Sequence, residues 1–264
     1  MLQIKNVYKT FNAGTVNEKV ALNGLNLQLN KGDFVTVIGG NGAGKSTMLN
    51  SVAGVFPVDE GSILIDGVDV TALPEYKRAK FIGRVFQDPM MGTAANMQIE
   101  ENMALAARRG KARTLRPGIT KQEREFYREK LKILELGLED RMTSKVGLLS
   151  GGQRQALTLL MATLQEPKLL LLDEHTAALD PKTAAKVLDA TERIVSMHNL
   201  TTVMITHNMR DAIAYGNRLV MMYDGHVVVD VSGEEKKNLT VEQLLNLFSQ
   251  ASGSDEVNDK LLLS

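Results

Sequence analysis

The stretch GGNGAGKST at residues 39–47, directly after the apolar run DFVTVI at 33–38, decides the fold of this 264-residue chain. It fits the pattern of a glycine, four residues, a glycine, a lysine and a serine or threonine, framed by Gly39 and Gly44. Glycines let successive backbone N–H groups turn inward around phosphate oxygens, and the dipole of the following helix points its positive end at them. The stretch therefore predicts a phosphate-binding loop between a strand and a helix.

The loop residues have separate expected roles. The Lys45 ammonium neutralises the β- and γ-phosphates, and the Ser46 hydroxyl is placed to bind Mg²⁺. A helix is expected to begin at Thr47 and to pack its apolar side chains Met48, Leu49 and Val52 on the sheet. The residues expected around the phosphates are Gly39, Gly40, Asn41, Gly42, Ala43, Gly44, Lys45, Ser46 and Thr47.

A second motif, LLLLDE at residues 169–174, reads as a buried strand that ends in two acids. At the carboxyl end of a parallel strand both acids can enter the crevice where ligands bind. Asp173 is then expected to hold Mg²⁺ through water, and Glu174 to polarise an attacking water. Two acids that cap a strand only for solubility are the alternative, which the phosphate-binding loop disfavours.

The rest of the chain supports an α/β fold. Runs rich in apolar and β-branched residues alternate with helical patterns and predict a mainly parallel, buried sheet. These runs are LQIKNV near the start, DFVTVI, LLLL at 169–172, TTVMI at 201–205 and RLVMMY at 218–223. Between about Asp88 and Thr163 the spacing is helical, in ENMALAARR and EREFYREKLKILELGL, so this part reads as an inserted helical subdomain.

Composition excludes several classes of protein. The 31 Lys plus Arg balance 31 Asp plus Glu, so the chain has neither the acidic excess of a disordered chain nor the basic excess of a nucleic-acid binder. No apolar stretch approaches the ~20 residues of a membrane helix, and the amino terminus does not resemble a signal peptide. The absence of Cys excludes disulfides and thiolate metal sites.

A basic stretch follows at residues 108–130, with nine basic and three acidic residues interrupted by Gly110, Pro117 and Gly118. A solvated loop that runs into a helix is one interpretation, and contact with lipid headgroups or an acidic partner is the other. The chain ends with one expected helix around 241–249 and a polar SGSDEVNDK tail.

The segment LLSGGQRQAL at 148–157 adds a family resemblance. LSGGQ after a phosphate-binding loop and shortly before LLLLDE resembles the signature of the ATP-binding cassette (ABC) ATPases. The resemblance extends over nearly the whole chain, through RVFQDP around Gln87, AALD at 177–180 and VMITHN around His207. It implies a P-loop NTPase of the ABC ATPase type, α/β, with a mainly parallel core sheet, an antiparallel β subdomain and the inserted helical subdomain.

The resemblance implies roles for further residues, with ATP and Mg²⁺ as cofactors. Phe11 matches the aromatic on which adenine stacks, with Tyr8 as the competing candidate. Gln87 matches the glutamine that reaches Mg²⁺ and the attacking water, and His207 the histidine that holds the γ-phosphate and orients that water. The other three histidines, His175, His198 and His226, have no comparable context.

The signature implies a site shared by two chains. Ser150, Gly151, Gly152 and Gln153 precede or begin an apolar helix, and in this family that helix end binds the γ-phosphate held by the other subunit. ATP is expected to join two copies head to tail, with Asp180 crossing the interface. His175 departs from the family pattern, because most relatives have proline there, which puts the local loop geometry in doubt.

Several functions stay open. The preferred hypothesis is the ATPase subunit of a bacterial transporter, at the cytoplasmic face of the membrane, that drives separate permease subunits. Import with an extracellular or periplasmic substrate-binding protein is favoured, with an amino acid, and more narrowly an aromatic amino acid, as the expected cargo. An exporter ATPase is the runner-up. A soluble ABC ATPase that acts on DNA or ribosomes is disfavoured, since no long heptad coiled coil or second cassette is present and no nucleic acid partner is expected.

The expected division is an ATP-binding core of residues 1–87 and 164–232, a helical signature subdomain of 88–163, and a short carboxyl-terminal helix and tail of 233–264. The stretch after Gln87 is expected to face the permease. Its methionines form either an adaptable apolar socket for the permease or part of the core. They are Met90, Met91, Met97 and, just beyond, Met103.

Overall fold

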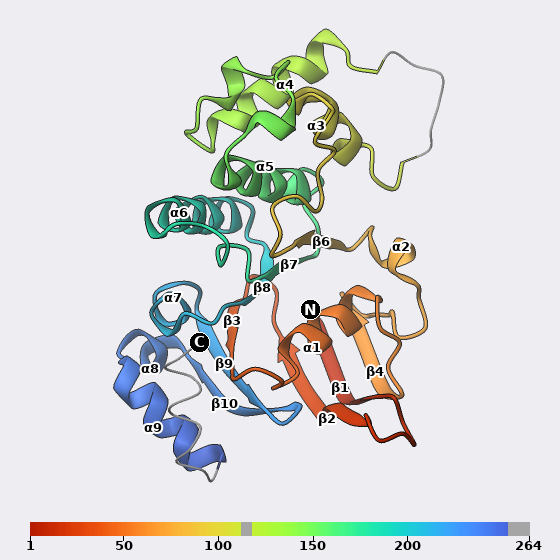
Figure 1. The fold of residues 1–264 in the computed structure, drawn as a ribbon, viewed down its shortest axis with the longest axis vertical. Coiled ribbons are helices and arrows are strands. Elements are labelled where there is room, and N and C mark those ends of the chain that lie inside the picture. The colour runs from red at the N-terminus through yellow and green to blue at the C-terminus, as the bar shows by residue number, and fades with distance from the viewer. Residues whose placement is uncertain (112–117, 253–264) are drawn as a thin grey trace.

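The protein is described by a computed structural model of residues 1–111 and 118–252, with side chains as far as residue 250. Its strands form two sheets, a six-stranded sheet in the order β10-β9-β3-β8-β7-β6 and a four-stranded sheet in the order β2-β1-β4-β5 (Figure 1). Helices cover the six-stranded sheet, and one group of them extends away from it at the top of the view.

The six-stranded sheet is parallel except at one edge. Strand β3 (Phe34–Ile38) lies between β8 (Thr201–Ile205) and β9 (Arg218–Tyr223), and β7 (Leu169–Asp173) joins β8 to β6 (Ile82–Val85). Strand β10 (His226–Ser232) is antiparallel to β9. Every residue of β3 and β8 is buried, as expected of a parallel sheet covered on both faces. The predicted mainly parallel core sheet is confirmed.

The four-stranded sheet is antiparallel, and it contains one strand that was predicted to lie in the parallel sheet. The run LQIKNV, predicted to join the parallel sheet, lies in β1 (Leu2–Phe11) and pairs antiparallel with β2 and β4. Its alternating buried residues Leu2 and Ile4 are typical of a strand with one buried face, and this period of two distinguishes it from the continuous apolar runs of the parallel strands. The remaining strands are β2 (Lys19–Leu29), β4 (Glu60–Ile65) and β5 (Val68–Asp69).

Helix α1 (Lys45–Ala53) follows β3 and begins at Lys45, two residues before the expected start at Thr47. Its predicted core residues Met48, Leu49 and Val52 are buried. The other helices around the sheets are α2 (Glu75–Arg78), α6 (Pro181–His198), α7 (Met209–Ala214), α8 (Gly233–Lys237) and α9 (Val241–Ser252).

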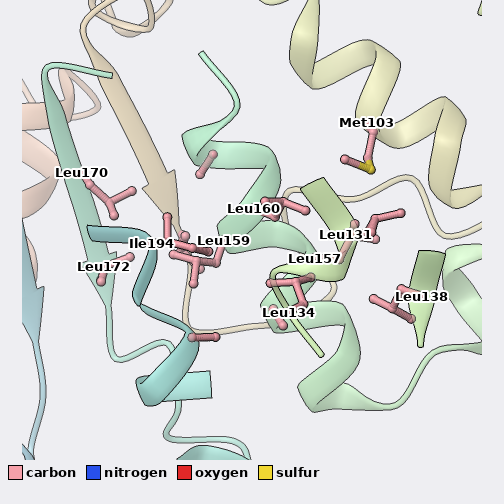
Figure 2. Packing of buried hydrophobic residues seen from close by; sticks show 14 of the residues in the cluster. Met103, Leu131, Leu134, Leu138, Leu157, Leu159, Leu160, Leu170, Leu172 and Ile194 are labelled. Atoms are coloured by element: carbon pink, nitrogen blue, oxygen red, sulfur yellow. The ribbon is translucent and has the colours of Figure 1, made fainter. Parts of the chain in front are cut away.

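The helices predicted between residues 88 and 163 are α3 (Ile99–Ala107), α4 (Lys121–Lys132) and α5 (Gly151–Thr163), with 3-10 turns at Leu138–Asp140 and Val146–Leu148. Helix α5 supplies Leu157, Leu159 and Leu160 to a core shared with α4 and with β7 (Figure 2). The helical pattern of EREFYREKLKILELGL continues beyond the helix itself, which ends at Lys132. The backbone becomes left-handed at Glu135 and Gly137, where φ is 54° and 66°.

Part of two expectations lies outside the described residues. In the basic stretch, Arg108 and Lys111 are exposed and Arg124 pairs with Glu100, whereas residues 112–117 are not described. The expected carboxyl-terminal helix is α9, and the polar tail from residue 253 is not described. Within the described ranges, no helix is long and apolar enough to cross a membrane.

Candidate functional site

The phosphate-binding loop runs from the end of β3 to the start of α1. Gly39 and Gly44 adopt φ of 151° and 98°, backbone conformations that residues other than glycine rarely adopt. A Cβ atom would lie 2.3 Å from the Met222 carbonyl oxygen at Gly39 and 2.5 Å from the Ala21 carbonyl oxygen at Gly44. Both glycines are therefore required by the backbone path as well as by the phosphate pattern.

The Lys45 side chain is buried at the centre of this loop. Its Nζ donates hydrogen bonds to the carbonyl oxygens of Gly39, at 2.7 Å, and Gly40, at 3.1 Å. Burial lowers the pKa of Lys45, while the carboxylates of Glu174 and Asp173 act in the opposite direction. The ammonium group is thus held in the loop and lies within the field of both acids.

The two acids stand at the carboxyl end of β7, as predicted. Burial raises the pKa of Asp173, an effect opposed first by the neighbouring Arg84 guanidinium. Glu174 has a left-handed backbone, with φ of 45°, and its N–H donates to the Ile205 carbonyl of β8 at 3.1 Å. A non-glycine residue in this conformation stores strain of about 1 to 3 kcal/mol, and such residues concentrate at functional sites.

His207 lies directly beside Glu174. Its Nδ1 is 3.6 Å from Glu174 Oε2, and the histidine side chain is 40% exposed while that of the glutamate is 22% exposed. Burial raises the pKa of Asp211, and His207 partly offsets that effect. The ends of β7 and β8 therefore bring together two of the three residues predicted to be catalytic. We call residues 39–47, Asp173, Glu174 and His207 the phosphate-loop region.

The third predicted catalytic residue, Gln87, follows β6, the strand that pairs with β7. It is exposed in the loop after β6, and within the described residues no hydrogen bond joins it to either acid. The loop is anchored next to it, because Gln155 Nε2 of α5 donates to the Phe86 carbonyl oxygen at 2.8 Å. Gln87 is therefore at the same end of the sheet as the two acids but makes no bond to them.

The two aromatic candidates on β1 differ in position. Phe11 ends the strand, packs edge-on against Phe56 with ring centroids 5.2 Å apart, and pairs across the ladder with Lys19. Lys19 Nζ in turn lies 3.3 Å from the position that a Cβ of Gly42 would take. The hydroxyl of Tyr8 lies instead against Gly24, farther along β2. Phe11 is therefore the aromatic that is linked to the phosphate-binding loop.

The signature residues begin α5. Ser150 caps this helix by accepting from the Gln153 N–H at 3.3 Å, and Gln153 Oε1 accepts from the Ser150 N–H at 3.1 Å. A Cβ on Gly152 would lie 2.0 Å from Cγ2 of Thr183 in α6. Asp180 caps α6 by accepting from the Thr183 N–H at 3.1 Å. We call Ser150–Gln153 together with Asp180 the signature region.

The signature region and the phosphate-binding loop lie on different sides of the molecule. In Figure 1, α5 and α6 stand above β6 and β7, whereas α1 stands below them. The amino end of α5 carries no acidic residue in its first turn, so its helix dipole is available to an anion.

His175, the departure from the family pattern, is buried immediately after Glu174. Its Nε2 is 3.1 Å from Thr191 Oγ1, whose own hydrogen is donated to the Val187 carbonyl oxygen at 2.8 Å. The ring nitrogen must therefore be the donor, which fixes the Nε2–H tautomer. Burial lowers the pKa of His175 to about 4, so the ring is neutral at physiological pH.

Two further residues at this site were missed by sequence reasoning. Arg84 of β6 touches Asp173, and Lys19 of β2 reaches the phosphate-binding loop. A signal for Arg84 was present, because it is the only charged residue in the strand IGRV. A charged residue within a strand of this sheet suggests a partner among the acids expected at the strand ends. Lys19 gave no signal, since its position depends on the register of β1 and β2.

A wide groove of about 1580 Å³ opens between β6 and the helices α3, α4 and α5. Its lining includes Phe86, Gly92 and Ala94 from the stretch around Gln87, which was expected to face a permease. The four methionines of that expectation do not line it: Met90 and Met91 are exposed, Met97 is half-buried and Met103 belongs to the core. Only Met103 therefore matches the core alternative.

The residues expected at the metal site suit Mg²⁺. They offer a hydroxyl, a carboxylate and an amide, so every donor is an oxygen, the ligand type that this ion prefers. In the described part of the chain, no group of three or more His, Cys, Asp or Glu side chains could hold a metal alone. Mg²⁺ is usually held by one or two carboxylates together with substrate phosphates and water, which this donor set permits.

Comparisons with known proteins agree with this geometry. The family model described as ABC transporter matches residues 22–177. The chain is 45% identical over 251 residues to the "Tyrosine transport ATP-binding protein" of Clostridioides difficile (strain R20291), with 95% of this chain and 100% of that protein covered. It is 31% identical to the "Phosphonates import ATP-binding protein PhnC" of Lactobacillus johnsonii (strain CNCM I-12250 / La1 / NCC 533), with 97% and 100% covered.

A solved structure has the same fold. The structure described as "Dimeric Structure of MJ0796, a Bacterial ABC Transporter Cassette" superposes with a TM-score of 0.75 at 30% identity. The match covers 88% of this chain and 98% of that one. The predicted P-loop NTPase fold of the ABC ATPase type is confirmed by this likeness.

Proposed function

Because the chain belongs to the ABC transporter family, as an ATP-binding and ATP-hydrolysing subunit, we propose that it energises the import of a small solute through separate permease subunits. The observation that carries the proposal is the pairing of an ATP site with an open groove beside the Gln87 loop, which offers a permease a place to dock. The subunit then acts peripherally, at the cytoplasmic face of the membrane.

The proposed cargo is an amino acid, with tyrosine or another aromatic amino acid as the first candidate. The support is the likeness over nearly the whole chain to a protein named for tyrosine transport. Import is favoured over export because other relatives, such as the phosphonate protein, are named for import. An extracellular or periplasmic substrate-binding protein completes the proposed importer.

In the proposed reaction, the loop N–H groups and Lys45 bind the phosphates of ATP while adenine stacks on Phe11. Glu174 accepts a proton from the attacking water, and His207 orients that water beside the γ-phosphate. The 3.6 Å separation of His207 Nδ1 and Glu174 Oε2 supports this joint role. The left-handed backbone of Glu174, with φ of 45°, is the kind of strain that concentrates at functional sites and supports a catalytic role for it.

Ser46, Asp173 and Gln87 are proposed to hold Mg²⁺, which when bound neutralises charge that develops on the phosphates. The half-buried carboxylate of Asp173 is poised for this at the end of β7. Gln87 approaches when its loop responds to the groove, and in this way couples the permease to the reaction.

The signature region is proposed to act on ATP held by a second copy of the chain. Ser150, Gly151, Gly152 and Gln153 present the amino end of α5 to the γ-phosphate, and Asp180 crosses the interface. The fold similarity to a dimeric ABC cassette supports a homodimer with two shared sites. ATP then joins the subunits, and hydrolysis lets them part.

The proposed division of labour follows the predicted boundaries. Residues 1–87 and 164–232 form the ATP-binding core, residues 88–163 the helical signature subdomain, and residues 233–264 a carboxyl-terminal helix and tail. The helices α3, α4 and α5 lie together above the sheet in Figure 1, which supports this division, although their core continues into β7 and α6.

The test is an uptake measurement in the native host. Cells that lack the chain are complemented with wild type or with Lys45→Ala, and the entry of radiolabelled tyrosine, phenylalanine and tryptophan is followed. Wild type should restore uptake of at least one of them, and Lys45→Ala should not. Co-purification from gently solubilised membranes should recover a multi-spanning permease. Unchanged uptake in the deletion strain together with slower efflux would favour the exporter alternative.

A further inference from the structure

Arg84 connects the groove to the acid proposed to hold Mg²⁺. It lies in β6, and Ile82, Arg84 and Phe86 are all among the residues that line the groove. Arg84 also touches Asn50 of α1 and Asp173 of the phosphate-loop region. The residue thus belongs to the groove lining and contacts the phosphate-loop region at the same time.

The contacts of Arg84 differ in quality. One terminal nitrogen donates to Asn50 Oδ1 of α1 at 2.7 Å, and the same nitrogen is 3.4 Å from Asp173 Oδ2. The guanidinium also stacks on the Phe86 ring at 4.6 Å, next to Gln87. The bond to Asn50 is short, whereas the contact with Asp173 is long and replaceable.

Arg84 also has an unused donor. Its Nε is buried, and no acceptor for it exists among the described residues. A buried donor without a partner is unfavourable, typically by an amount comparable to a lost hydrogen bond. An acceptor brought into the groove would therefore be drawn to Arg84.

The groove favours an acidic occupant. Its basic lining residues are Arg84, Arg108, Arg109 and Lys111, and its acidic ones are Glu75 and Glu123. Arg108 and Glu123 pair with each other at 2.8 Å, which leaves three basic residues and one acidic residue among the described lining residues. Arg109 Nε is, like that of Arg84, buried without a partner in the described part of the chain. Charge complementarity thus points to carboxylates on the docking segment.

We propose that Arg84 is a positioning residue that restrains Asp173 until a carboxylate of the permease segment in the groove pairs with the Arg84 guanidinium. In the free subunit, Arg84 occupies one oxygen of Asp173 and its positive charge opposes an incoming Mg²⁺. Pairing with the permease carboxylate neutralises Arg84 and releases Asp173 for the metal. The inference rests on the proposed docking of a permease and on the proposed Mg²⁺ role of Asp173.

The first experiment uses the purified full-length chain without permease. Binding of a fluorescent ADP is titrated with Mg²⁺, so that no turnover occurs, in wild type, Arg84→Met, Arg84→Gln and Arg84→Lys. Removal of the charge in the Met and Gln variants should tighten the apparent Mg²⁺ affinity about fivefold. Arg84→Lys should stay near wild type, because the charge remains. Arg128→Met, which removes an exposed arginine of α4, is the matched control and should change nothing.

Folding is checked by the thermal midpoint, and Arg84→Gln keeps a polar partner for Asn50 if Arg84→Met is unstable. An unchanged or weakened Mg²⁺ affinity in a folded, charge-free variant would overturn the inference. Asp173→Asn separates this failure from that of the proposed function. If Asp173→Asn weakens Mg²⁺ binding but Arg84→Gln has no effect, only the role of Arg84 is wrong. If Asp173→Asn has no effect either, the proposed Mg²⁺ role of Asp173 fails.

The second experiment uses the complex with its permease. Arg84→Gln should still co-purify with the permease, but addition of the permease should no longer tighten Mg²⁺ binding as it does in wild type. Leu105→Glu, which places a charge at an exposed apolar position of the groove, should abolish co-purification. Retained co-purification of Leu105→Glu would count against docking in this groove, whatever the first experiment gives. A wild-type complex whose Mg²⁺ affinity equals that of the free chain would overturn the release by the permease.

Discussion

The phosphate-loop region and the signature region are built on different principles. In the first, residues from three separate parts of the chain meet at the carboxyl ends of β3, β7 and β8, and their charges act on one another. In the second, the polar groups satisfy each other locally, through the caps of α5 and α6. The first region brings its charged groups together within one chain, whereas the second leaves the amino end of α5 open to the anion that we propose a second copy supplies.

The difference between the two regions indicates which step needs a second copy of the chain. A site that is assembled within one chain can bind nucleotide alone, but a surface with its own hydrogen bonds complete contributes only when another molecule brings an anion to it. Substitutions in the two regions should therefore separate nucleotide binding from association.

The largest effect is expected for Glu174→Gln. The variant keeps Lys45 and the loop, so ATP binding should persist, while hydrolysis should fall by about 10²- to 10⁴-fold because the base is removed. ATP-dependent dimers should accumulate, which size-exclusion chromatography with light scattering detects. Rapid turnover by this variant would contradict the assignment of Glu174 as the base.

One substitution in each region tests directly whether the two regions have separate roles. Lys45→Ala should weaken ATP binding by about a hundredfold, because a buried charge that faces the phosphates is lost. Ser150→Arg should leave ATP binding by the monomer within about twofold, because Ser150 is not part of the phosphate-loop region. It should prevent association, because a large side chain at the exposed signature region blocks the second copy. Isothermal titration calorimetry and light scattering measure the two properties. Dimerisation of Ser150→Arg with ATP would disprove the shared site.

Burial of His175, in the loop between the two regions, makes the stability of the fold depend on pH. His175 has a pKa of about 4 in the folded chain against 6.5 for the ordinary group. The unfolded chain therefore takes up the proton first as the pH falls. The stabilisation is complete above pH 6.5 and is lost between about pH 6.5 and 4, by about 3 kcal/mol in all.

Urea unfolding at a series of pH values tests this contribution. His175→Gln, which can still donate to Thr191, should have a flatter pH dependence between pH 4 and 6.5 than wild type. His226→Gln, at an exposed turn, is the matched control and should follow wild type. An identical slope in His175→Gln would show that another group dominates the acid sensitivity.

A smaller effect is expected where the signature region contacts α6. Gly152→Ala places a methyl group 2.0 Å from Thr183 Cγ2, and it should lower the free energy of unfolding by about 1 to 3 kcal/mol. Thr183→Ser removes that methyl and keeps the hydroxyl, so it should restore much of the loss in the double variant. Gly151→Ala, whose Cβ would be 3.3 Å from Leu179, is the milder control. Additive losses in the double variant would exclude the steric explanation.

The smallest effect is expected at the rim of the phosphate-loop region. Lys19 has no ion-pair partner in the described residues and reaches Gly42. Lys19→Ala should weaken ATP binding about fivefold, the effect of one exposed charge, and leave adenosine binding unchanged. Lys31→Ala, an exposed lysine in the turn before β3, is the matched control. Equal losses for ATP and adenosine would place Lys19 at the base instead of the phosphates.

The sequence predicted β3, β7, β8 and β9 because each is a run rich in apolar and β-branched residues, and it predicted both acids because they end such a run. It did not include β6, whose short sequence IGRV contains a glycine and an arginine. It misplaced β1, since apolar and β-branched composition alone does not distinguish a parallel strand from an antiparallel one. It extended the helix of α4 too far, because leucines continue through Leu134 and Leu136 whereas the left-handed backbone at Glu135 ends the regular pattern.

The residues of the site could be predicted where one short segment of sequence contains them. They could not be predicted where their contacts depend on the pairing of strands that are far apart in the sequence. The loop with Lys45 is local, and so are Glu174 and the capped signature residues. The contact of Arg84 with Asp173 exists only because β6 pairs with β7, in a register that no local pattern encodes. The position of Lys19 likewise depends on its ladder pairing with Phe11.

Among the described residues, strand β6 is the outermost strand of its sheet and pairs on one side only, with β7. Its backbone amides that point away from β7 lack a neighbouring strand and should exchange with solvent deuterium faster than those of β3, which is enclosed on both sides. Occupation of the groove should slow exchange in the peptide that spans β6 and the Gln87 loop. Exchange at this edge would therefore report the arrival of a partner without any measurement of turnover.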